Sequence, residues 1–440
     1  MIKSKIDSTN GKQMFNEMHL GRLKVTSLLL IIFFALPHVS ASENAGSYTL
    51  NIYGNANMDE NIDDADVSYV QEIISGNSKP TELADANHDG KVDALDIDQA
   101  KRIIEGDAKN LTIIDAQNRS VTLQIPIENV ISVNTGAIEI MRDIGVDINE
   151  VFIGVSSYAL EDDLYWPELK GKESIKYGSP DYEKIAKLKP DLVILYKTPS
   201  KEESIEKFDA IDVPVICLDC FNLEGLDGST KMLGELFNKR EKANELIQWY
   251  RGYIDLVKDR TEGLSAENKP KALFYNFPDI NYPVVKVSTS KASQHLLIVE
   301  AGGKNLAADL NSSTGSAAVD REWILTQNPD VIIGSLAASK GKCGYSADPD
   351  KAFGYMHKVH DMLVVDQAIR KTNAANERNI YIIDTDLNRG PMWAAGIAYT
   401  AKILHPELFK DLDPEAILKE YFDKWQGIPY KGIYIYPPLE

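Results

Sequence analysis

The sequence predicts an α/β protein in which two α/β lobes with parallel sheets are joined by one long helix, behind a small α-helical domain. Three observations support this fold class. A proline-free stretch over about residues 230–262 carries apolar residues at spacings of three and four, as one face of a helix does. Segments 184–196 and 323–334, on either side of it, both read as a helix end, then Pro-Asp, then a short apolar strand. Elsewhere strands alternate with helices, which implies parallel sheets covered on both faces.

The long helix organises the rest of the chain. A helix over 230–262 would span about 50 Å, which exceeds the diameter of a small domain. We therefore expect it to bridge two similar lobes, and an ordinary packed helix between ordinary strands is the alternative. The expected boundaries are 1–41 for a signal peptide, 47–107 for the small domain, 111–226 for lobe 1, 227–263 for the linking helix and 264–440 for lobe 2.

The N-terminal region predicts export. An apolar run over residues 25–36 follows Arg22 and Lys24, and small residues at 39–41 offer a cleavage pattern. This composition is typical of a secretory signal peptide, and the run is too short for a comfortable transmembrane helix. An uncleaved anchor is the alternative. Because no cysteine lies near the cleavage pattern, a bacterial-type lipid anchor is not expected.

Charge and cysteine content narrow the function classes. The chain has 440 residues and a formal net charge of −19, which argues against nucleic acid as a partner. Cys217 and Cys220 have the gap of redox and zinc motifs, but neither a second pair nor a nearby histidine completes a zinc site. A disulfide or plain buried thiols are expected there, and Cys343 is either free or paired.

Two stretches of the small domain, thirty residues apart, repeat one pattern of oxygen-bearing side chains. The second-loop residues are Asp85, Asn87, Asp89, Lys91, Asp93 and Asp96, and the first-loop residues are Asn55, Asn57, Asp59, Asn61, Asp63 and Asp66. Lys91 would offer its backbone carbonyl, and Gly90 allows the sharp turn. Calcium is a hard cation that takes six to eight oxygen ligands, and this spacing wraps them around one ion. Acidic turns without metal are the alternative.

Each of these loops leads into an amphipathic helical segment, over 67–74 and 97–104, and each has Asp at its twelfth position. With this pattern, residues 47–107 resemble a dockerin domain. The resemblance implies structural calcium in both loops and docking onto a cohesin-bearing protein. Asn55 and Glu60 depart from the usual pattern, so the first loop is expected to bind calcium more weakly. Docking through this domain would replace a lipid anchor and keep the exported protein extracellular and associated with the cell surface.

The large domain carries a second resemblance. Its expected elements are a hairpin over 111–125, strands over 130–133, 151–155, 192–195, 213–217, 272–275, 331–333 and 380–383, and helices between them. The hairpin and the motifs at 141–145, 177–191, 300–305 and 328–330 resemble, in order and spacing, the substrate-binding proteins of ABC importers for iron–siderophore complexes, haem and cobalamin. The resemblance implies the class III periplasmic-binding-protein fold, in which a small-molecule metal chelate is held between two lobes and delivered to an ABC permease.

Ligands of open α/β sheets bind beyond the carboxyl ends of the strands. Candidate ligand-binding residues at those ends, and in the loops that follow, are Asn134, Thr135, Tyr158, Trp166, Tyr196, Phe277, Arg389 and Trp393. Aromatic rings suit a flat macrocycle or an aryl chelate, and Arg389 would bind a carboxylate or phenolate oxygen of an anionic chelate. Core packing is the alternative for the tryptophans. The acidic pair Asp162-Asp163 is interpreted as an ordinary surface feature.

Members of this family dock on the permease through one acidic residue on each lobe. Glu300 is the candidate on lobe 2, Glu168 or Glu173 is the candidate on lobe 1, and solvated surface charge is the alternative. His357 and His360 leave direct binding of a bare metal ion as a second function. A third is a non-transport component of a cell-surface scaffold. Catalysis has no positive support, since neither a nucleophile elbow nor a phosphate-cradling loop is present, although chelatase-like enzymes share a two-lobed architecture.

Overall fold

The computed structural model describes residues 48–198, 205–276, 285–337 and 342–439; the expected signal peptide and Phe277 lie outside these ranges. Lobe 1 is built on a parallel five-stranded sheet in the order β5-β4-β3-β6-β7. Its strands are β3 (Val130–Ser132), β4 (Phe152–Ser156), β5 (Glu173–Ile175), β6 (Leu192–Tyr196) and β7 (Val215–Leu218). Its helices are α3 (Thr135–Asp143), α4 (Ile148–Val151), α5 (Ser157–Leu160), α6 (Tyr182–Leu188) and α7 (Ile205–Asp209). Because all neighbouring pairs are parallel, the carboxyl ends of these strands meet at one edge of the sheet.

Lobe 2 is built on a seven-stranded sheet that is only partly parallel. Its strands are β8 (Lys271–Asn276), β9 (Val285–Ser288), β10 (Lys304–Asn305), β11 (Ser316–Val319), β12 (Val331–Leu336), β13 (Ile380–Asp384) and β14 (Ile435–Tyr436). β8, β12 and β13 form the parallel centre, whereas β9, β11 and β14 pair antiparallel to their neighbours. The expectation of parallel sheets therefore holds in full for lobe 1 and for the centre of lobe 2. Its longer helices are α10 (Ser293–Glu300), α11 (Arg321–Gln327), α12 (Pro349–Val365), α14 (Trp393–Leu404) and α15 (Pro414–Glu420), which runs into the π-helix η7 (Tyr421–Gln426).

The expected continuous helix over 230–262 is wrong in one respect, because it is two helices. α8 (Leu223–Leu236) ends before α9 (Arg240–Thr261) begins. Asn238 adopts a left-handed conformation with φ 51°. The amide of Lys239 donates to the carbonyl of Gly234 at 2.7 Å, and the amide of Asn238 donates to Glu235 at 3.4 Å. These two bonds form the hydrogen-bond pattern of a helix that stops at a left-handed residue, a position that asparagine tolerates.

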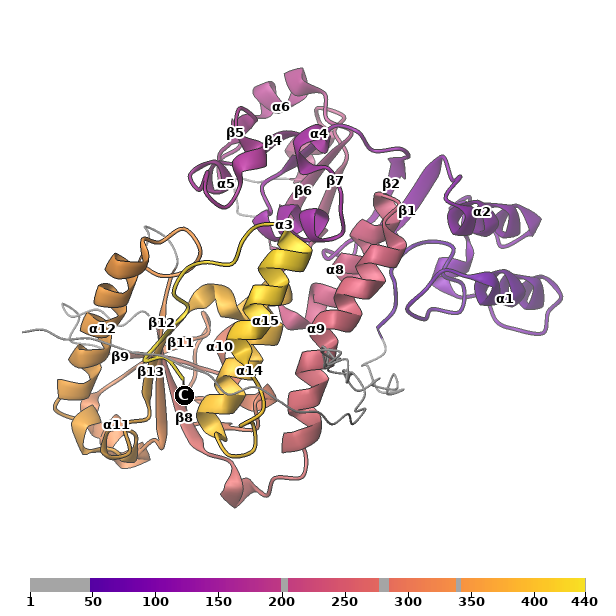
Figure 1. Ribbon diagram of the computed structural model, residues 1–440. Coiled ribbons are helices and arrows are strands. Elements are labelled where there is room, and N and C mark those ends of the chain that lie inside the picture. Colours follow the sequence, from indigo (N-terminus) through magenta and orange to yellow (C-terminus); the bar gives the residue numbers. More distant parts are fainter. Residues whose placement is uncertain (1–47, 199–204, 277–284, 338–341, 440) are drawn as a thin grey trace, which may run out of the picture. The chain divides into compact units, whose positions relative to one another are not determined.

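α8 and α9 therefore form a helical hairpin. Asp227 of α8 accepts hydrogen bonds from Tyr250 Oη at 2.7 Å and from Arg251 Nε at 2.9 Å, both on α9. Gly234 lets α9 approach closely, since a Cβ at this position would lie 2.6 Å from Ala243 Cβ. α9 has 22 residues, about 33 Å of helix, and its chain leads from the lobe 1 sheet to the lobe 2 sheet. The long link between the lobes is thus α9, braced along its side by α8 (Figure 1).

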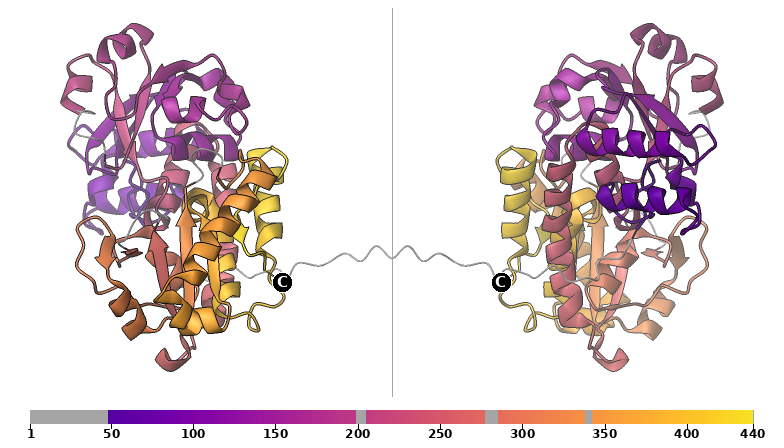
Figure 2. Two further views of the ribbon diagram at one scale, coloured as in Figure 1. Left: turned by 90° about the vertical axis from the view of Figure 1, so that its left-hand side faces the viewer. Right: turned by 90° about the vertical axis from the view of Figure 1, so that its right-hand side faces the viewer.

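The small N-terminal domain consists of two loop–helix units and packs against the same hairpin. Its helices are α1 (Asp64–Ile74) and α2 (Ala94–Glu105), and each begins with an Asp capping box. The guanidinium of Arg240 on α9 donates to the carbonyls of Ile103 and Ile104 at 3.1 and 3.2 Å. The described residues accordingly belong to one compact unit, in which α1 and α2 lie beside lobe 1 and α9 (Figure 2). Between them and lobe 1 runs the antiparallel hairpin of β1 (Asn110–Ile114) and β2 (Ser120–Gln124), as expected.

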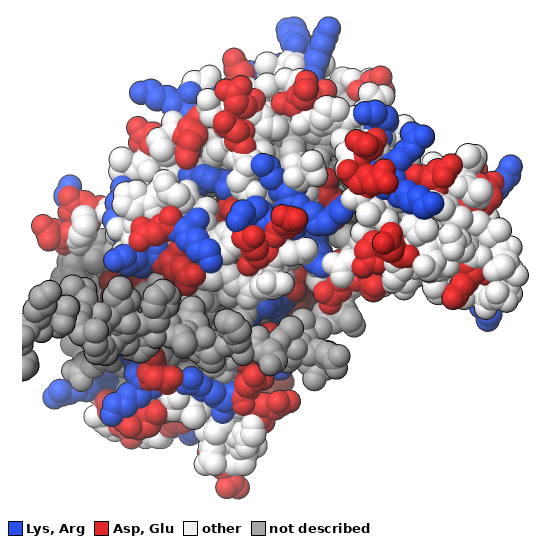
Figure 3. All heavy atoms as spheres, turned by 45° about the vertical axis from the view of Figure 1, so that its right-hand side comes forward, with Lys and Arg blue, Asp and Glu red and all other residues white. Residues whose placement is uncertain are grey.

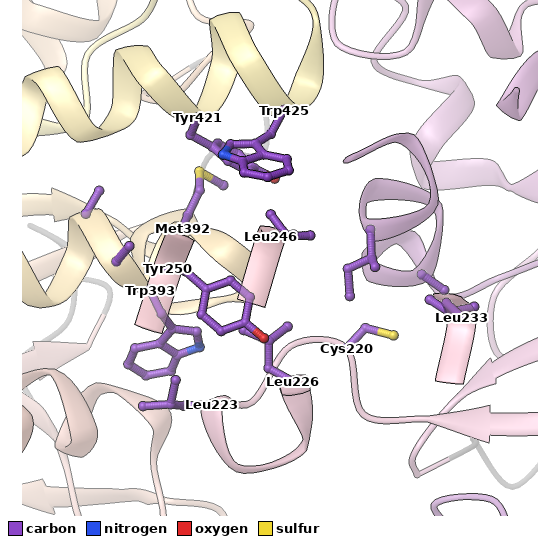
Figure 4. Close-up of a cluster of buried hydrophobic side chains, with 14 of the residues drawn as sticks. Cys220, Leu223, Leu226, Leu233, Leu246, Tyr250, Met392, Trp393, Tyr421 and Trp425 are labelled. Carbon is purple, nitrogen blue, oxygen red and sulfur yellow. The ribbon is translucent and has the colours of Figure 1, made fainter. Parts of the chain in front are cut away.

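Where α8, α9, α14 and η7 meet, a cluster of large apolar side chains fixes the hairpin to lobe 2. Figure 4 shows this cluster, in which Trp393 lies beside Leu223 and Tyr250 lies beside Leu226. Trp393 and Tyr250 are fully buried.

Among the described helices, none is both long enough and apolar enough to cross a membrane.

Candidate functional site

A cleft of about 700 Å³ opens where lobe 1 and lobe 2 face each other. Its lobe 1 wall is formed by Thr135, Glu139, Tyr158, Ala159, Glu161, Asp162, Asp163, Leu164, Tyr165 and Trp166. Its lobe 2 wall is formed by Ala337, Tyr345, Ser346, Thr385, Asp386, Arg389, Met392, Phe422 and Tyr434. A ligand in this cleft would contact both lobes at once.

The lobe 1 wall follows from the ends of its parallel strands. Asn134, two residues after the end of β3, is buried and donates to the carbonyls of Leu195 and Leu218 at 3.2 and 3.1 Å. Its side-chain oxygen also caps α3 by accepting from Ala137 at 3.2 Å. Asn134 thus ties the ends of three strands together and starts the helix whose first turn presents Thr135 to the cleft.

The lobe 2 wall centres on Arg389, which follows β13. Its guanidinium lies 3.1 Å from a carboxylate oxygen of Asp386 and 5.5 Å from the ring centre of Phe221. Although burial opposes its charge, the carboxylates of Asp386 and Glu139 raise the pKa of Arg389 above its usual range. Burial raises the pKa of Asp384 and Asp386. Arg389 therefore remains a cation, held in place by acidic neighbours.

The floor of the cleft is a buried polar network that joins α3 to the π-helix η7. Glu139 Oε1 accepts from Tyr165 Oη at 2.6 Å and from Tyr421 Oη at 2.8 Å. Tyr421 Oη also lies 3.2 Å from Asp143, and Gln426 bonds both Asp143 and Arg142. Burial, reinforced by the carboxylate of Glu139, raises the pKa of Asp143 well above its ordinary value. The network thereby links Gln426 and Asp143, which lie 283 positions apart in the chain.

The structure brings four of the expected ligand residues to the cleft wall: Thr135, Tyr158, Trp166 and Arg389. Tyr196 stands behind the wall, where its hydroxyl lies 3.3 Å from both the amide and the hydroxyl of Thr135. Asn134 is also behind the wall, as the strand tie described above. Both positions follow from side chains that turn inward at the strand ends to satisfy buried backbone groups.

Trp393 was expected to bind the ligand, but it does not line the cleft. It is fully buried in the cluster of Figure 4, and its indole nitrogen donates to the carbonyl of Phe221 at 2.9 Å. The reason is helical geometry: Trp393 is the first residue of α14, and the side chain covers the α8–α9 hairpin. Its role is packing, which was the alternative for the tryptophans.

Several cleft residues were missed by sequence reasoning. Tyr345, Phe422 and Tyr434 lie in loops or in the C-terminal π-helix, far from any parallel strand end. Glu139 lies on a helix face that reads as core. Asp162 and Asp163, interpreted as an ordinary surface pair, line the cleft as well. For Asp162 and Asp163, the signal that could have found them is their position, four and five residues beyond Tyr158 in a segment that follows the end of β4.

The two Asp/Asn-rich loops of the small domain share one hydrogen-bond pattern. In the second loop, Asp96 accepts from the amides of Asn87 and Asp93 at 3.1 and 2.7 Å. In the first, Asp66 accepts from the amides of Asn57 and Asp63 at 3.1 and 2.8 Å. Both twelfth-position carboxylates are completely buried, and burial raises the pKa of Asp66 to about 6 and that of Asp96 above its ordinary value.

These loops fit a hard cation. Their donors are carboxylate, amide and carbonyl oxygens, and a calcium ion would offset the cost of burying Asp66 and Asp96. In the first loop the side-chain oxygen of Asn55 is buried without a partner, as a ligand oxygen awaiting a cation would be. Within the described ranges, no three His, Cys, Asp or Glu side chains converge on a ready-made metal site. Calcium would therefore draw on Asn55, Asn57, Asn87 and backbone carbonyls as well as on the aspartates.

The remaining candidates lie on the surface or in the core. Glu300 ends α10 and is half-buried. Glu168 lies 3.5 Å from Arg142, and Glu173 forms an ion pair with Lys184 at 2.7 Å. Cys217, Cys220 and Cys343 are all buried free thiols. His357 lies 3.3 Å from Asp361 on the outer helix α12 and does not belong to the cleft wall.

Fold and cleft define a two-lobed binding protein, and comparison with known proteins specifies the family. The periplasmic binding protein family matches residues 130–387, and the dockerin type I domain matches residues 53–105. The chain belongs to the periplasmic binding protein family, whose members bind ligands and are not enzymes. Its N-terminal resemblance to a dockerin and its resemblance to ABC-importer binding proteins are both confirmed.

Individual relatives agree with this assignment. An uncharacterized ABC transporter substrate-binding lipoprotein of Bacillus subtilis, YvrC, is 23% identical over 67% of this chain and 85% of its own length. The vitamin B12-binding protein of Yersinia pestis is 24% identical over 48% of this chain and 71% of its own length. Among solved structures, the TroA-like periplasmic binding protein FepB of Veillonella parvula has a TM-score of 0.63 and 25% identity, over 74% of this chain and 98% of that one.

A second solved structure supports the fold alone. The molybdate periplasmic binding protein MolA of Haemophilus influenzae, bound to molybdate, has a TM-score of 0.57 and 20% identity, over 73% of this chain and 99% of that chain. The protein is thus an ABC-type substrate-binding protein with an appended dockerin domain, and its fold class is the one expected.

Proposed function

We propose that this protein is exported and captures a metal chelate, such as an iron–siderophore complex, haem or cobalamin, in the cleft between its lobes. The observation that carries the proposal is the inter-lobe cleft of about 700 Å³ with aromatic side chains on both walls. This volume lies in the range of small-molecule sites, and aromatic rings offer large apolar area with fixed geometry. A vitamin B12-binding protein among the relatives favours the same class of cargo.

Titration with ferric siderophores, haem and cobalamin tests this function. Binding should quench the fluorescence of Trp166, which lines the cleft. Tyr158 is 59% exposed on the cleft wall, so Tyr158→Ala should lower the affinity at least about fivefold, the scale of one lost aromatic contact. Phe353→Ala is the matched control, since Phe353 is 44% exposed on α12 outside the cleft. Failure of every chelate to bind would refute the proposal.

We propose further that residues 47–107 tether the protein to a cohesin-bearing partner at the cell surface, while lobe 1 (111–226) and lobe 2 (264–440) present the cargo to an ABC permease. Calcium in the two loops would be structural. Glu300 and either Glu168 or Glu173 are the proposed permease contacts. Of these, Glu168 and Glu173 already have cationic neighbours, so Glu300 is the contact with the most freedom to pair with a permease arginine.

The alternatives have less support. A bare metal ion needs converging ligands, and His357 and His360 lie on α12, away from the cleft wall. A purely structural scaffold component would need no cleft. A pull-down with cohesin in calcium, followed by chelate titration of the captured protein, separates the tether from the cargo function.

A further inference from the structure

The cleft wall carries a strong excess of negative charge. Among the described residues that line it are five carboxylates, namely Glu139, Glu161, Asp162, Asp163 and Asp386, and one cationic side chain, Arg389. On the face drawn in Figure 3 the signs are mixed, and Lys and Arg lie among Asp and Glu. The excess is therefore a local property of the cleft as well as a reflection of the net charge of −19.

The single guanidinium does not offset this excess. Arg389 lies 3.1 Å from Asp386, so the pair contributes little net charge to the cleft. Two further cations lie beside the wall. The guanidinium of Arg142 lies 4.2 Å from the centre of the Trp166 ring but is buried next to Glu168 and Asp143. The ammonium of Lys431 lies over the Tyr345 ring, 4.3 Å from its centre.

The other four carboxylates form no ion pair within the described ranges. Glu161 and Asp163 are exposed. Asp162 accepts from the amide of Tyr165 at 3.1 Å and from the hydroxyl of Ser346 on the opposite lobe. Glu139 accepts from two tyrosine hydroxyls at the floor. These donors are neutral, so they provide hydrogen bonds to Asp162 and Glu139 but no positive charge to offset the carboxylates. Partial desolvation of the cleft strengthens electrostatic interactions there.

Aromatic walls complement these charges. Rings from both lobes line the cleft: Tyr158, Tyr165, Trp166, Tyr345, Phe422 and Tyr434. The faces of such rings attract cations and cover apolar surface at the same time. The carboxylates do not converge into a metal-binding cluster in the described residues, so the charge excess does not suit a bare ion. Separated carboxylates and broad rings suit a large cargo whose positive charge is spread or carried on a side arm.

We infer that the cleft selects chelates of net positive charge and discriminates against anionic ones. This rests on the proposed function and specifies its cargo class. It also reverses the expectation for Arg389, whose guanidinium serves to neutralise and position Asp386 and leaves no free cation for an anionic chelate.

A matched series of chelates tests the inference on the full-length protein. An iron(III) linear trihydroxamate with a free terminal amine carries one positive charge; acetylation of the amine gives a neutral chelate, and succinylation gives an anionic one. The three share one metal core and differ only on the side arm. A corrinoid series, bearing an amine or a carboxylate on the same side arm, repeats the comparison on a second scaffold. The cationic member of each bound series should bind about tenfold more tightly than the anionic member at low salt, and the gap should narrow at high salt.

Two charge-removing variants locate the effect. Glu161→Gln with Asp163→Asn removes two exposed carboxylates of the wall, and should reduce the preference for the cationic over the anionic chelate about three- to tenfold. The control is Asp259→Asn with Glu262→Gln, an equal charge change at exposed positions around the end of α9, outside the cleft wall. It should leave the preference unchanged, and an equal loss in both variants would reduce the effect to overall charge and overturn the inference.

The outcomes separate the two proposals. Equal or tighter binding of the anionic chelate, in a series that binds, overturns the charge selectivity and leaves the proposed function standing. Binding of none of the chelates, in either series or in the siderophore, haem and cobalamin panel, overturns both.

Discussion

Individual side chains in the cleft floor bind the C-terminal part of the chain to lobe 1. Glu139 and Asp143 lie one turn apart on α3, and both accept from Tyr421 of η7. Burial raises the pKa of Asp143, and the neighbouring carboxylate of Glu139 raises it further. A π-helix at this point is consistent with the occurrence of such turns at functional sites, since it brings Tyr421 and Gln426 to the same network.

The protonation of Asp143 predicts a pH-dependent stability. Because its folded-state pKa is raised by burial and by Glu139, the folded protein holds a proton that the unfolded chain releases above about pH 4. The Asp143 carboxyl therefore makes its full contribution to the free energy of unfolding at pH values below its pKa in the unfolded chain. This contribution is lost as the pH rises through its pKa in the folded protein. Asp143→Asn keeps a neutral hydrogen-bonding group and should remove this contribution, at most about 1.4 kcal/mol per pH unit in the window.

Urea unfolding of wild type and variant over a pH series measures the difference. Glu407→Gln, at an exposed position, is the control and should leave the slope unchanged. Parallel curves for wild type and Asp143→Asn would contradict the assignment.

Between elements, the first Asp/Asn-rich loop of the small domain is attached to α8 by hydrogen bonds. The ammonium of Lys231 donates to the carbonyl of Glu60 at 2.9 Å and to the side-chain oxygen of Asn61 at 2.8 Å. Burial lowers the pKa of Lys231, and the Glu60 carboxylate, 4.0 Å from the ammonium, opposes that shift. Glu60 stands where the usual loop has glycine, so this departure from the dockerin pattern has a structural partner in Lys231 of α8.

Replacement of Lys231 should release this loop. Lys231→Met keeps much of the apolar stem and removes the donor, so amide hydrogen exchange over residues 50–66 should accelerate about tenfold for each 1.4 kcal/mol of local stability lost. Lys242→Met, whose ammonium is exposed on α9 beside Glu245, is the matched control. Unchanged protection in Lys231→Met would show that the loop is held by other contacts.

Calcium should stabilise the α1–α2 domain through its loops. A ligand that binds only the folded state at about 100 times its Kd contributes about 2.7 kcal/mol. Scanning calorimetry of the full-length protein should show a transition that EGTA moves to lower temperature, and Asp89→Asn should weaken the tighter of two calcium-binding events. The first loop, with Asn55 in place of Asp, should be the weaker site. A profile insensitive to EGTA would refute structural calcium.

The elements also show where sequence reasoning ends. Periodicity located the strands β3, β4, β6, β8, β12 and β13, since continuous apolar runs mark buried parallel strands. It joined α8 to α9, because one left-handed asparagine, Asn238, interrupts the helix without breaking the apolar pattern. It missed the short strands β5, β9, β10, β11 and β14, of which β5, β11 and β14 lie at sheet edges.

At the scale of the whole molecule, the same limit applies to the cleft. Strand ends predicted Thr135, Tyr158, Trp166 and Arg389 on its wall. Tyr345, Phe422 and Tyr434 reach it only through the path of the C-terminal chain and a loop after β12, which local pattern does not encode. The net charge of the cleft wall could not be predicted from the sequence either, because it depends on which carboxylates have cationic neighbours in the fold.

The proposed delivery to a permease predicts a role for one carboxylate outside the cleft. Glu300→Gln should leave chelate affinity unchanged and reduce uptake or stimulated ATPase activity with the cognate transporter, because it removes a charge from the proposed docking face of lobe 2. Glu377→Gln, an exposed carboxylate after α13, is the control. Full activity of Glu300→Gln would remove this residue from the docking surface.

The fastening of the small domain to the hairpin has a geometric consequence. Arg240 and Lys231 hold α2 and the first loop directly against α9 and α8, with no free spacer between them. A partner protein bound to α1 and α2 would therefore set the direction in which the cleft opens relative to that partner. Whether the binding protein reaches its transporter would then depend on where the partner lies along the cell envelope. Rotation of the lobes about the small domain would not contribute.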